Sequence, residues 1–308
     1  MGFKEKVRLC FHYPSQINEK YSWIVAFFGR IGFFTKAFMY SLIGYLICDG
    51  VIYNKKQNSS PQGVFDFIGA YSIILVYIAF GGILVYAAWR IWEGLFGQGY
   101  NIHMSPKKNF FRYRLSPIVS GGVYIAYSAY IIEVLADPHS LPAKGNSENQ
   151  SSGSCFPECW RNSGIGMFGL AILAFAMLCG CISQLVTAIT QNFKDDFDLE
   201  KLRNNVVIKY ILIMTGIIGF LARALLFGLV SVFFILLLSG KEVDLDPSLS
   251  TIGQALYAFQ NITAGFFILF ITGVGLNVYG VFAVLNIYYR VFPTVNNRII
   301  LNRIEGEI

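Results

Sequence analysis

Two similar apolar segments of this sequence each carry one cation at the same place. Residues 31–44 read IGFFTKAFMYSLIG and contain Lys36. Residues 218–231 read IGFLARALLFGLVS and contain Arg223. A charge inside a membrane is costly and by default marks a functional site, but a long cationic side chain one turn inside a span also reaches the headgroups and anchors the helix. We favour anchoring for both residues and keep contact with an anionic lipid headgroup or a substrate as the alternative.

Two polar side chains, Gln184 and Asn277, also fall inside apolar segments. Amide side chains in membrane helices commonly form hydrogen bonds between helices, which contribute about 0.6–2 kcal/mol each. Lining a solute path is the other interpretation. We favour the interhelical hydrogen bond for both residues.

The rest of the sequence offers little catalytic chemistry. The three histidines, His12, His103 and His139, fall outside the apolar segments, so they fit neither a bis-His haem between helices nor a clustered zinc site. The sequence shows no phosphate-binding glycine loop, no Ser-His-Asp set and no paired carboxylates in a polar pocket. Its acidic residues lie near the ends of the apolar segments or in linkers. We therefore expect no enzyme, no cofactor and no metal site.

Two features of the hydrophilic linkers suggest covalent modification. Cys155 and Cys159, in CFPEC, are a candidate disulfide in an oxidising compartment, with free thiols as the alternative. The sequons at Asn58 and Asn149 are candidate glycosylation sites if their side of the membrane faces a secretory lumen.

The composition predicts an integral membrane protein. Of the 308 residues, 55% are apolar and 14% charged, against about 25% charged residues in soluble domains. Six apolar stretches are long enough to cross a hydrocarbon core of about 30 Å. They are residues 33–52, 67–92, 115–136, 164–190, 206–238 and 259–289. The sequence thus predicts an all-α bundle of six transmembrane helices that forms one domain over residues 1–308.

Basic residues are unevenly divided between the linkers. Those after the first, third and fifth spans hold five of the 24 Lys and Arg residues, and the other 19 lie in the termini, in the remaining linkers or in adjacent spans. By the positive-inside rule, the tails 1–17 and 293–308 face the cytoplasm or the mitochondrial matrix. The net charge of +6 is then a topology signal, and we expect no nucleic-acid binding. We favour the mitochondrial inner membrane over the plasma membrane or an endomembrane.

The two cation-bearing segments belong to an internal repeat. Aligning Gly32 with Gly219 pairs Lys36 with Arg223. A weaker copy, LSPIVSGGVYIAYS, lies in the middle of the chain and has Ser120 in place of the cation. The repeat therefore extends over the odd-numbered spans.

The even-numbered spans repeat as well. GILVYAAWRIWE begins at Gly82 and GLNVYGVFAVLN begins at Gly275, so Tyr86 pairs with Tyr279. The repeating unit is a two-helix hairpin present three times in the same orientation, because an even number of spans makes the copies parallel. The units cover residues 18–103, 104–203 and 204–292.

These motifs resemble a bacterial membrane family called domain of unknown function 1206. The resemblance implies three tandem helix pairs, each with a basic entry motif and a Tyr-x-x-Trp-like exit, and it implies no established activity. The matching residues are Arg30, Gly32, Lys36, Gly82, Tyr86 and Trp89 in the first copy and Gly219, Arg223, Gly275, Leu276, Tyr279 and Phe282 in the third. The second copy departs from the pattern at Ser116, Ser120 and Gln184.

The missing catalytic chemistry favours a non-catalytic accessory subunit of a larger membrane complex, for example a respiratory-type assembly. Aromatic residues make up 16% of the chain, and Tyr and Trp cluster near span ends, as expected for contact with lipid and protein partners. The alternative is a small-solute or ion channel or transporter, with Gln184, Asn277 and Tyr279 as candidate lining residues.

Overall fold

The computed structural model describes residues 22–55, 58–96, 110–136, 164–197, 205–240, 249–260, 262–290 and 292, and its regular elements in these ranges are all helical. The helices are α2 (Ser22–Ile52), α3 (Pro61–Tyr71), α4 (Ile73–Phe96), α6 (Ser116–Ala136), α8 (Gly164–Thr190), α10 (Val206–Leu238), α11 (Thr251–Gln260) and α12 (Thr263–Tyr289). A π-helical turn, η2 (Phe111–Leu115), precedes α6, and a 3-10 turn, η4 (Asn192–Asp196), follows α8. The prediction of an all-α chain is confirmed.

Five of the described helices are long and apolar enough to cross a membrane. They are Trp23–Ile52, Ile73–Phe96, Gly164–Thr190, Val206–Leu238 and Ala264–Tyr289. The chain is therefore a multi-pass membrane protein. The remaining long helix, α6, has 21 residues and is not among these five, so the count of six spans stays a prediction.

The predicted boundaries are accurate for α8 and α10 and wrong at the start of the second span. The stretch 67–92 was expected to form one helix, but α3 ends at Tyr71 and α4 begins at Ile73. Between them, Ser72 has an extended backbone with φ −163° and ψ 125°. α3 has its own capped start, where the Ser60 side chain accepts a hydrogen bond from the Gly63 N–H. The two helices are therefore separate elements.

The last predicted span, 259–289, also begins in a separate short helix. α11 ends at Gln260, before α12 begins at Thr263. As at α3, a serine side chain caps the helix start, because Ser250 Oγ accepts from the Gly253 N–H at 3.2 Å. A short helix thus precedes both α4 and α12.

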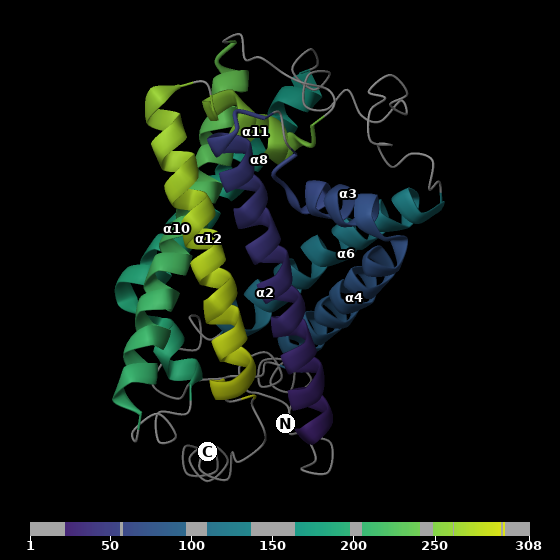
Figure 1. Ribbon diagram of the computed structural model, residues 1–308, viewed down its shortest axis with the longest axis vertical. Helices are drawn as coiled ribbons and strands as arrows, with labels where there is room; N and C mark the ends of the chain where they lie inside the picture. Colours follow the sequence, from purple (N-terminus) through teal and green to yellow (C-terminus); the bar gives the residue numbers. More distant parts are fainter. Residues whose placement is uncertain are drawn as a thin grey trace, which may run out of the picture.

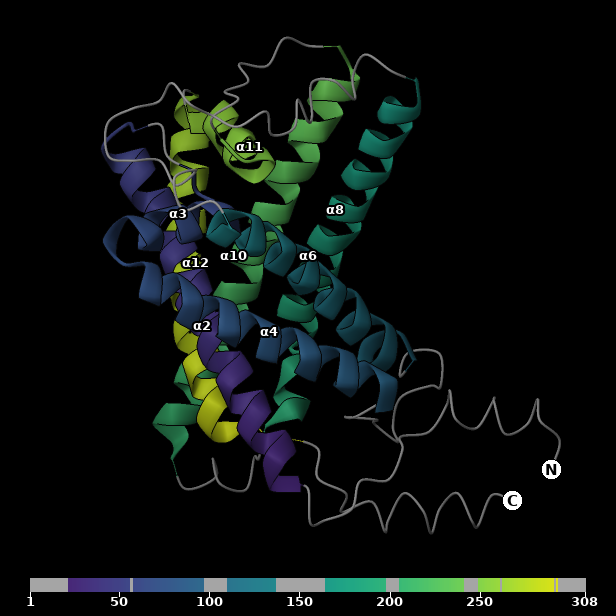
Figure 2. The same ribbon diagram turned by 90° about the vertical axis from the view of Figure 1, so that its right-hand side faces the viewer.

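The long helices pack as neighbours in a chain of contacts. The most extensive pairing joins α2 to α12, and further pairs are α8 with α10, α10 with α12, α4 with α6 and α2 with α4. Figure 1 shows α2 and α12 side by side, and Figure 2 shows α4 and α6 running obliquely past them. Within the described residues, α6 and α8 are not an extensively packed pair. The first and last long helices therefore lie at the centre of the bundle.

Small residues allow α2 and α12 to approach closely. A Cβ atom on Gly273 would lie 2.6 Å from Cys48 Sγ, and a Cβ atom on Gly44 would lie 2.6 Å from the Gly273 carbonyl oxygen. Two turns further along α12, a Cβ atom on Gly280 would collide with Ser41. Backbone contact of this kind is the usual basis of helix association in membranes.

The two hairpins α2–α4 and α10–α12 pack alike at positions that the sequence repeat pairs. Gly32 lies against the Tyr86 ring, and Gly219 lies against the Tyr279 ring in the same way. The ring centroids of Phe33 and Trp89 are 5.8 Å apart, and those of the aligned residues Phe220 and Phe282 are 5.6 Å apart. Because the glycines and the rings both correspond, the helix pairs α2–α4 and α10–α12 share one packing geometry.

At one end of the bundle, Asn58 joins the two short helices. Its Oδ1 accepts from Ser60 Oγ at 2.8 Å and from Ser250 Oγ at 2.6 Å, and its Nδ2 donates to Asp66 at 3.3 Å. A glycan at Asn58 would be attached to this same Nδ2 atom. The structure thus gives Asn58 a role in connecting α3 to α11, and its glycosylation stays untested.

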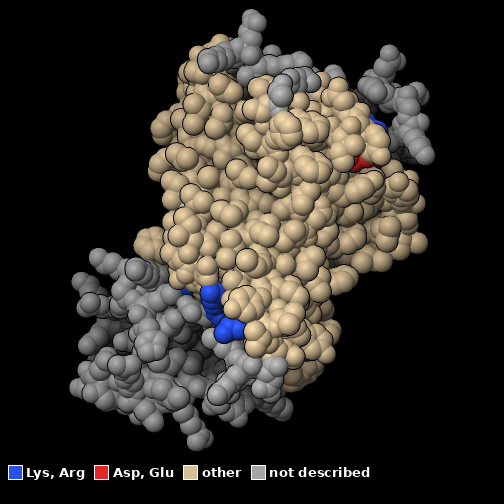
Figure 3. Space-filling model, turned by 60° about the vertical axis from the view of Figure 1, so that its left-hand side comes forward, with Lys and Arg blue, Asp and Glu red and all other residues tan. Residues whose placement is uncertain are grey.

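Charge is concentrated toward the ends of the molecule. On the face in Figure 3, Lys and Arg atoms gather toward one end, and a broad surface without charge extends from them. The long helices also carry many exposed large apolar side chains, such as Phe175 on α8 and Phe267 on α12. A contiguous apolar surface of this kind fits contact with lipid.

The glycine contacts give a first prediction. In Gly219→Ala, the new Cβ would lie 2.6 Å from Tyr279 Cδ2 and 2.9 Å from Tyr279 Cα. Because backbone atoms cannot yield easily, we expect a loss of about 1–3 kcal/mol of unfolding free energy. Gly81→Ala is the matched control, since a Cβ there meets nothing within 4 Å and gains about 0.5–1 kcal/mol of helix propensity. Thermal unfolding in detergent, followed by circular dichroism, compares the two, and equal midpoints would contradict the packing.

Asn58 gives a second prediction. Asn58→Ala removes the acceptor shared by Ser60 and Ser250, and we expect a loss of about 1–3 kcal/mol. Hydrogen exchange should accelerate in both α3 and α11 while α12 keeps its protection. Faster exchange confined to α3 would show that the two short helices are not coupled through Asn58.

Candidate functional site

The structure places Lys36 and Arg223 near the middle of their helices. Lys36 lies 14 residues after the start of α2 and 16 before its end. Arg223 lies 17 residues after the start of α10 and 15 before its end. α2 begins at Ser22, eleven residues before the predicted start of the span at 33, so Lys36 lies further inside its helix than the sequence suggests. The anchoring role of Lys36 stays a prediction.

Both cations are directed at one buried tyrosine. Lys36 Nζ lies 5.2 Å from the centre of the Tyr279 ring, and Arg223 Cζ lies 4.9 Å from it. The Arg223 guanidinium also donates a hydrogen bond from Nη1 to the Tyr279 hydroxyl at 3.0 Å. Since Tyr279 is only 2% exposed, the two charges face the bundle interior.

Aromatic rings form the walls around this point. Tyr40 packs edge-on against Tyr279 with a centroid distance of 4.8 Å, and Tyr86 packs edge-on against Tyr124 at 4.6 Å. The Tyr40 hydroxyl interacts with both Tyr124 and Arg223. Four tyrosines from α2, α4, α6 and α12 thus surround the cations. We call Lys36, Arg223, Tyr40, Tyr86, Tyr124 and Tyr279 the central cluster.

No carboxylate of the described residues pairs with either cation of the central cluster. Lys36 has ring contacts only, with Phe33 and Tyr279. Arg223 has its bond to Tyr279, and its Nε atom is buried without a hydrogen-bond partner. A buried cation without a counter-charge is costly. The central cluster therefore carries uncompensated positive charge.

Two carboxylates of the described residues, Glu93 and Asp196, pair with other cations. Glu93, with 5% of its side chain exposed, pairs with Arg90 and lies 3.9 Å from Arg290. Arg290 in turn lies 3.5 Å from Asp196, which pairs with Arg112 at 3.8 Å. This network joins α4, α12, η4 and η2. Sequence reasoning missed it, although the i,i+3 spacing of Arg90 and Glu93 on one helix was a local signal.

An aromatic layer separates this network from the central cluster. The rings of Phe33, Trp89 and Phe292 contact one another with centroid distances of 5.8 to 6.2 Å. Phe33 contacts one cation of each group, because Lys36 Nζ lies 5.8 Å and Arg290 Cζ 4.9 Å from its centre. The layer therefore covers the side of the central cluster that faces the network.

Gln184 lies at the level of Arg223. On the antiparallel pair α8–α10, a Cβ atom on Gly180 would lie 3.3 Å from Phe227 Cδ2. Gln184 lies one turn after Gly180 and Arg223 one turn before Phe227, so the two residues lie at the same level. The Gln184 Oε1 atom is buried without a hydrogen-bond partner. The predicted interhelical hydrogen bond of Gln184 is therefore not formed within the described part of the chain.

Asn277 forms its hydrogen bond within its own helix. Its Nδ2 donates to the Gly273 carbonyl, one turn earlier on α12, at 2.9 Å. The side chain also packs against Gly44 of α2, where a Cβ would lie 2.6 Å from Nδ2. Asn277 thus contacts the neighbouring helix, but the predicted hydrogen bond between helices is replaced by one to its own backbone.

Several predicted sites fall outside the described residues. These are Cys155, Cys159, Asn149 and the three histidines. Within the described ranges, Cys48, Cys179 and Cys181 are free thiols. The same ranges contain no group of three or more His, Cys, Asp or Glu side chains that could hold a metal ion.

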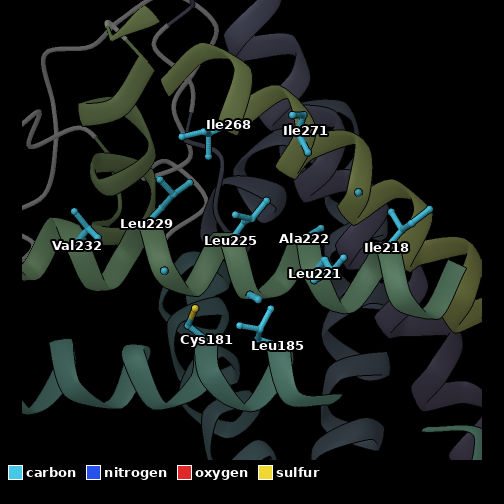
Figure 4. Close-up of a pocket in the computed structure, with 13 residues that line it drawn as sticks. Cys181, Leu185, Ile218, Leu221, Ala222, Leu225, Leu229, Val232, Ile268 and Ile271 are labelled. Carbon is cyan, nitrogen blue, oxygen red and sulfur yellow. The ribbon is translucent and has the colours of Figure 1, made fainter. Parts of the chain in front are cut away.

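An apolar groove lies on the other side of α10. It has a volume of about 570 Å³ and opens between α8, α10 and α12 (Figure 4). Its lining includes Leu185, Leu221, Leu225, Ile268 and Ile271, and none of its lining residues is charged. The helical spacing of Leu221 and Leu225 puts this face roughly opposite Arg223. The groove is therefore separate from the central cluster.

Comparisons with protein-family models, with curated proteins and with solved structures returned no match to this chain. The resemblance to domain of unknown function 1206 thus stays a prediction.

The ion-pair network gives a third prediction. Glu93→Gln leaves the buried cations Arg90 and Arg290 with less counter-charge, and we expect a loss of about 3–5 kcal/mol. Asp49→Asn is the control, because Asp49 pairs at 3.4 Å with Lys55, whose side chain is 57% exposed, and such pairs contribute about 0–1 kcal/mol. Thermal unfolding in one detergent compares the variants. Equal losses would mean that Glu93 does not neutralise the network.

Proposed function

We propose that this chain is a membrane protein of the solute channel or transporter class, and that its central cluster holds an anion. The observation that carries the proposal is the meeting of Lys36 and Arg223 at Tyr279 without a carboxylate. Ionisable residues that face the interior of a membrane bundle commonly mark substrate or ion pathways.

The electrostatics of the central cluster favour an anionic ligand. Two like charges near one ring repel each other, and burial removes the water that would screen them. An anion between Lys36 and Arg223 would offset both costs. The alternative role, anchoring at the headgroups, calls for a cation near a helix end, whereas these two lie near mid-helix and contact Tyr279. The placement thus favours ligand contact, the other role considered for this pair.

The surroundings of the central cluster favour a transporter over a permanently open channel. On one side lies the aromatic layer of Phe33, Trp89 and Phe292. On the other side lies the apolar core of α2, which includes Ile43 and Ile47 and is covered by α3. A site closed from both sides corresponds to an occluded state of alternating access, in which elements move to expose the site.

The proposal includes six spans arranged as three parallel hairpins. Its support is the matching packing of α2–α4 and α10–α12, with Gly32 against Tyr86 and Gly219 against Tyr279. Contacts between consecutive hairpins also correspond, because α4 packs on α6, α8 on α10 and α12 on α2. A transporter built from such repeats would hold its substrate where the repeats meet.

The second candidate is a non-catalytic accessory subunit of a membrane complex, with the mitochondrial inner membrane as the proposed location. The observation that favours it is the unpaired outer side of α8, where only 17% of the apolar window is buried. Phe168, Phe175 and Ile189 are each more than two-thirds exposed there. Helices of a partner protein could pack on this face of α8 in place of lipid.

Flux through reconstituted protein tests the proposal. The purified full chain in liposomes should exchange at least one of chloride, acetate, sulfate and inorganic phosphate. Lys36→Met and Arg223→Met should each lower the flux at least about tenfold, the effect of losing one charge-assisted hydrogen bond. Lys55→Met at the exposed end should leave it unchanged. Absence of flux, together with co-purification of a stoichiometric partner in mild detergent, would support the accessory-subunit candidate instead.

A further inference from the structure

We infer that the central cluster binds a phosphate-type oxyanion, held between Lys36 and Arg223 with Gln184 as a neutral contact. This inference rests on the proposed function, because it names the ligand class of the same site. Its support comes from the directions of the hydrogen-bond donors, from the charge and from the position of Gln184.

The donors come from different helices. Lys36 approaches from α2 with three N–H groups that have no hydrogen-bond partner among the described residues. Arg223 approaches from α10 with a buried Nε–H that is also unpaired. The Tyr279 hydroxyl accepts from Arg223, so its own O–H remains able to donate. Donors that converge from α2, α10 and α12 suit a tetrahedral ligand with several acceptor oxygens better than a planar carboxylate.

The charge of the cluster suits a dianion. When both are protonated, Lys36 and Arg223 carry two positive charges, and no carboxylate of the described residues pairs with them. A phosphate monoester carries about −1.5 to −2 at pH 7, so it would neutralise both. A halide or a carboxylate would leave one charge uncompensated in the bundle interior. Arginine and lysine are also the side chains that most often bind phosphate groups.

Gln184 supplies the neutral contact. The contact of Gly180 with Phe227 places it at the level of Arg223, and its buried oxygen has no partner among the described residues. Because the oxygen and nitrogen of an amide are interchangeable by rotation, the NH2 group can take the position of that oxygen and donate to an anion. Gln184 thus has an unused hydrogen-bonding group at the level of the cations.

The phosphate group could belong to a free ion or to a lipid headgroup. The apolar groove gives no preference for a lipid, since it lies on the face of α10 roughly opposite Arg223. The two sources have the same chemistry at Lys36 and Arg223. They are distinguished by experiment.

Binding is measured on the purified full chain without a flux assay. In detergent, titration with inorganic phosphate should raise the thermal midpoint saturably, and isothermal titration should give a Kd at least about tenfold below those for chloride and acetate. Short-chain phosphatidic acid is the second probe, read by native mass spectrometry. Binding of phosphate alone identifies a free ion as the ligand, and binding of phosphatidic acid alone identifies a lipid headgroup. Either result supports the inference.

Matched variants locate the binding. Lys36→Gln and Arg223→Gln should each weaken phosphate binding at least about tenfold, and Gln184→Leu about threefold to tenfold. Gln62→Leu is the control, since Gln62 in α3 also has a buried oxygen without a partner but lies outside the central cluster. If Arg223→Gln does not fold, two variants that keep both positive charges replace it. Tyr279→Phe removes the hydroxyl that accepts from Arg223. Arg223→Lys removes the planar guanidinium group.

The contrary outcomes separate the two proposals. If chloride or acetate binds as tightly as phosphate and the variants abolish that binding, the phosphate inference is overturned and the proposed anion site stands. If none of these anions binds and both cation variants unfold at the wild-type temperature, the inference and the proposed function fail together.

Discussion

The placement of two cationic side chains against one buried tyrosine is the constraint on which the bundle depends. Arg223 reaches Tyr279 because Gly219, one turn away on α10, lets the ring lie against its backbone. Lys36 reaches the same ring because α2 and α12 approach closely at Gly44 and Gly273. Small residues at helix contacts, usually considered for association alone, here also determine where the charges lie.

Hydropathy predicted the long helices well and their interruptions poorly. The bounds of α8 and α10 follow from apolar stretches with polar residues on both sides, so composition was sufficient. The separation of α3 from α4 could not be seen in this way, because Ser72 lies in an apolar stretch that continues on both sides. The local signal was Ser60 followed by Pro61 at the first helical position, and it concerns capping rather than hydropathy.

The repeat identified the two cations but not the direction in which they point. That direction depends on where α2 begins, and residues 22–32, which include Arg30, were assigned to the region before the span. Once the helix extends to Ser22, Lys36 is a mid-helix residue. The partners of Glu93 could not be predicted either, because Arg290 lies almost two hundred residues away in sequence. Such contacts follow from tertiary packing alone.

The described cations differ in their partners: Arg90 and Arg290 lie beside a carboxylate, whereas Lys36 and Arg223 contact rings. This difference supports the proposal that Lys36 and Arg223 bind a ligand. Where this fold neutralises buried cations, it does so with carboxylates, as Glu93 does for Arg90 and Arg290. At the central cluster it supplies rings instead, and a cation–π contact contributes only about 0.5–2 kcal/mol. Rings stabilise a cation without cancelling its charge, so a positive potential remains that an anion can use. The aligned middle copy has Ser120 and no third cation, which leaves a site matched to one doubly charged ligand.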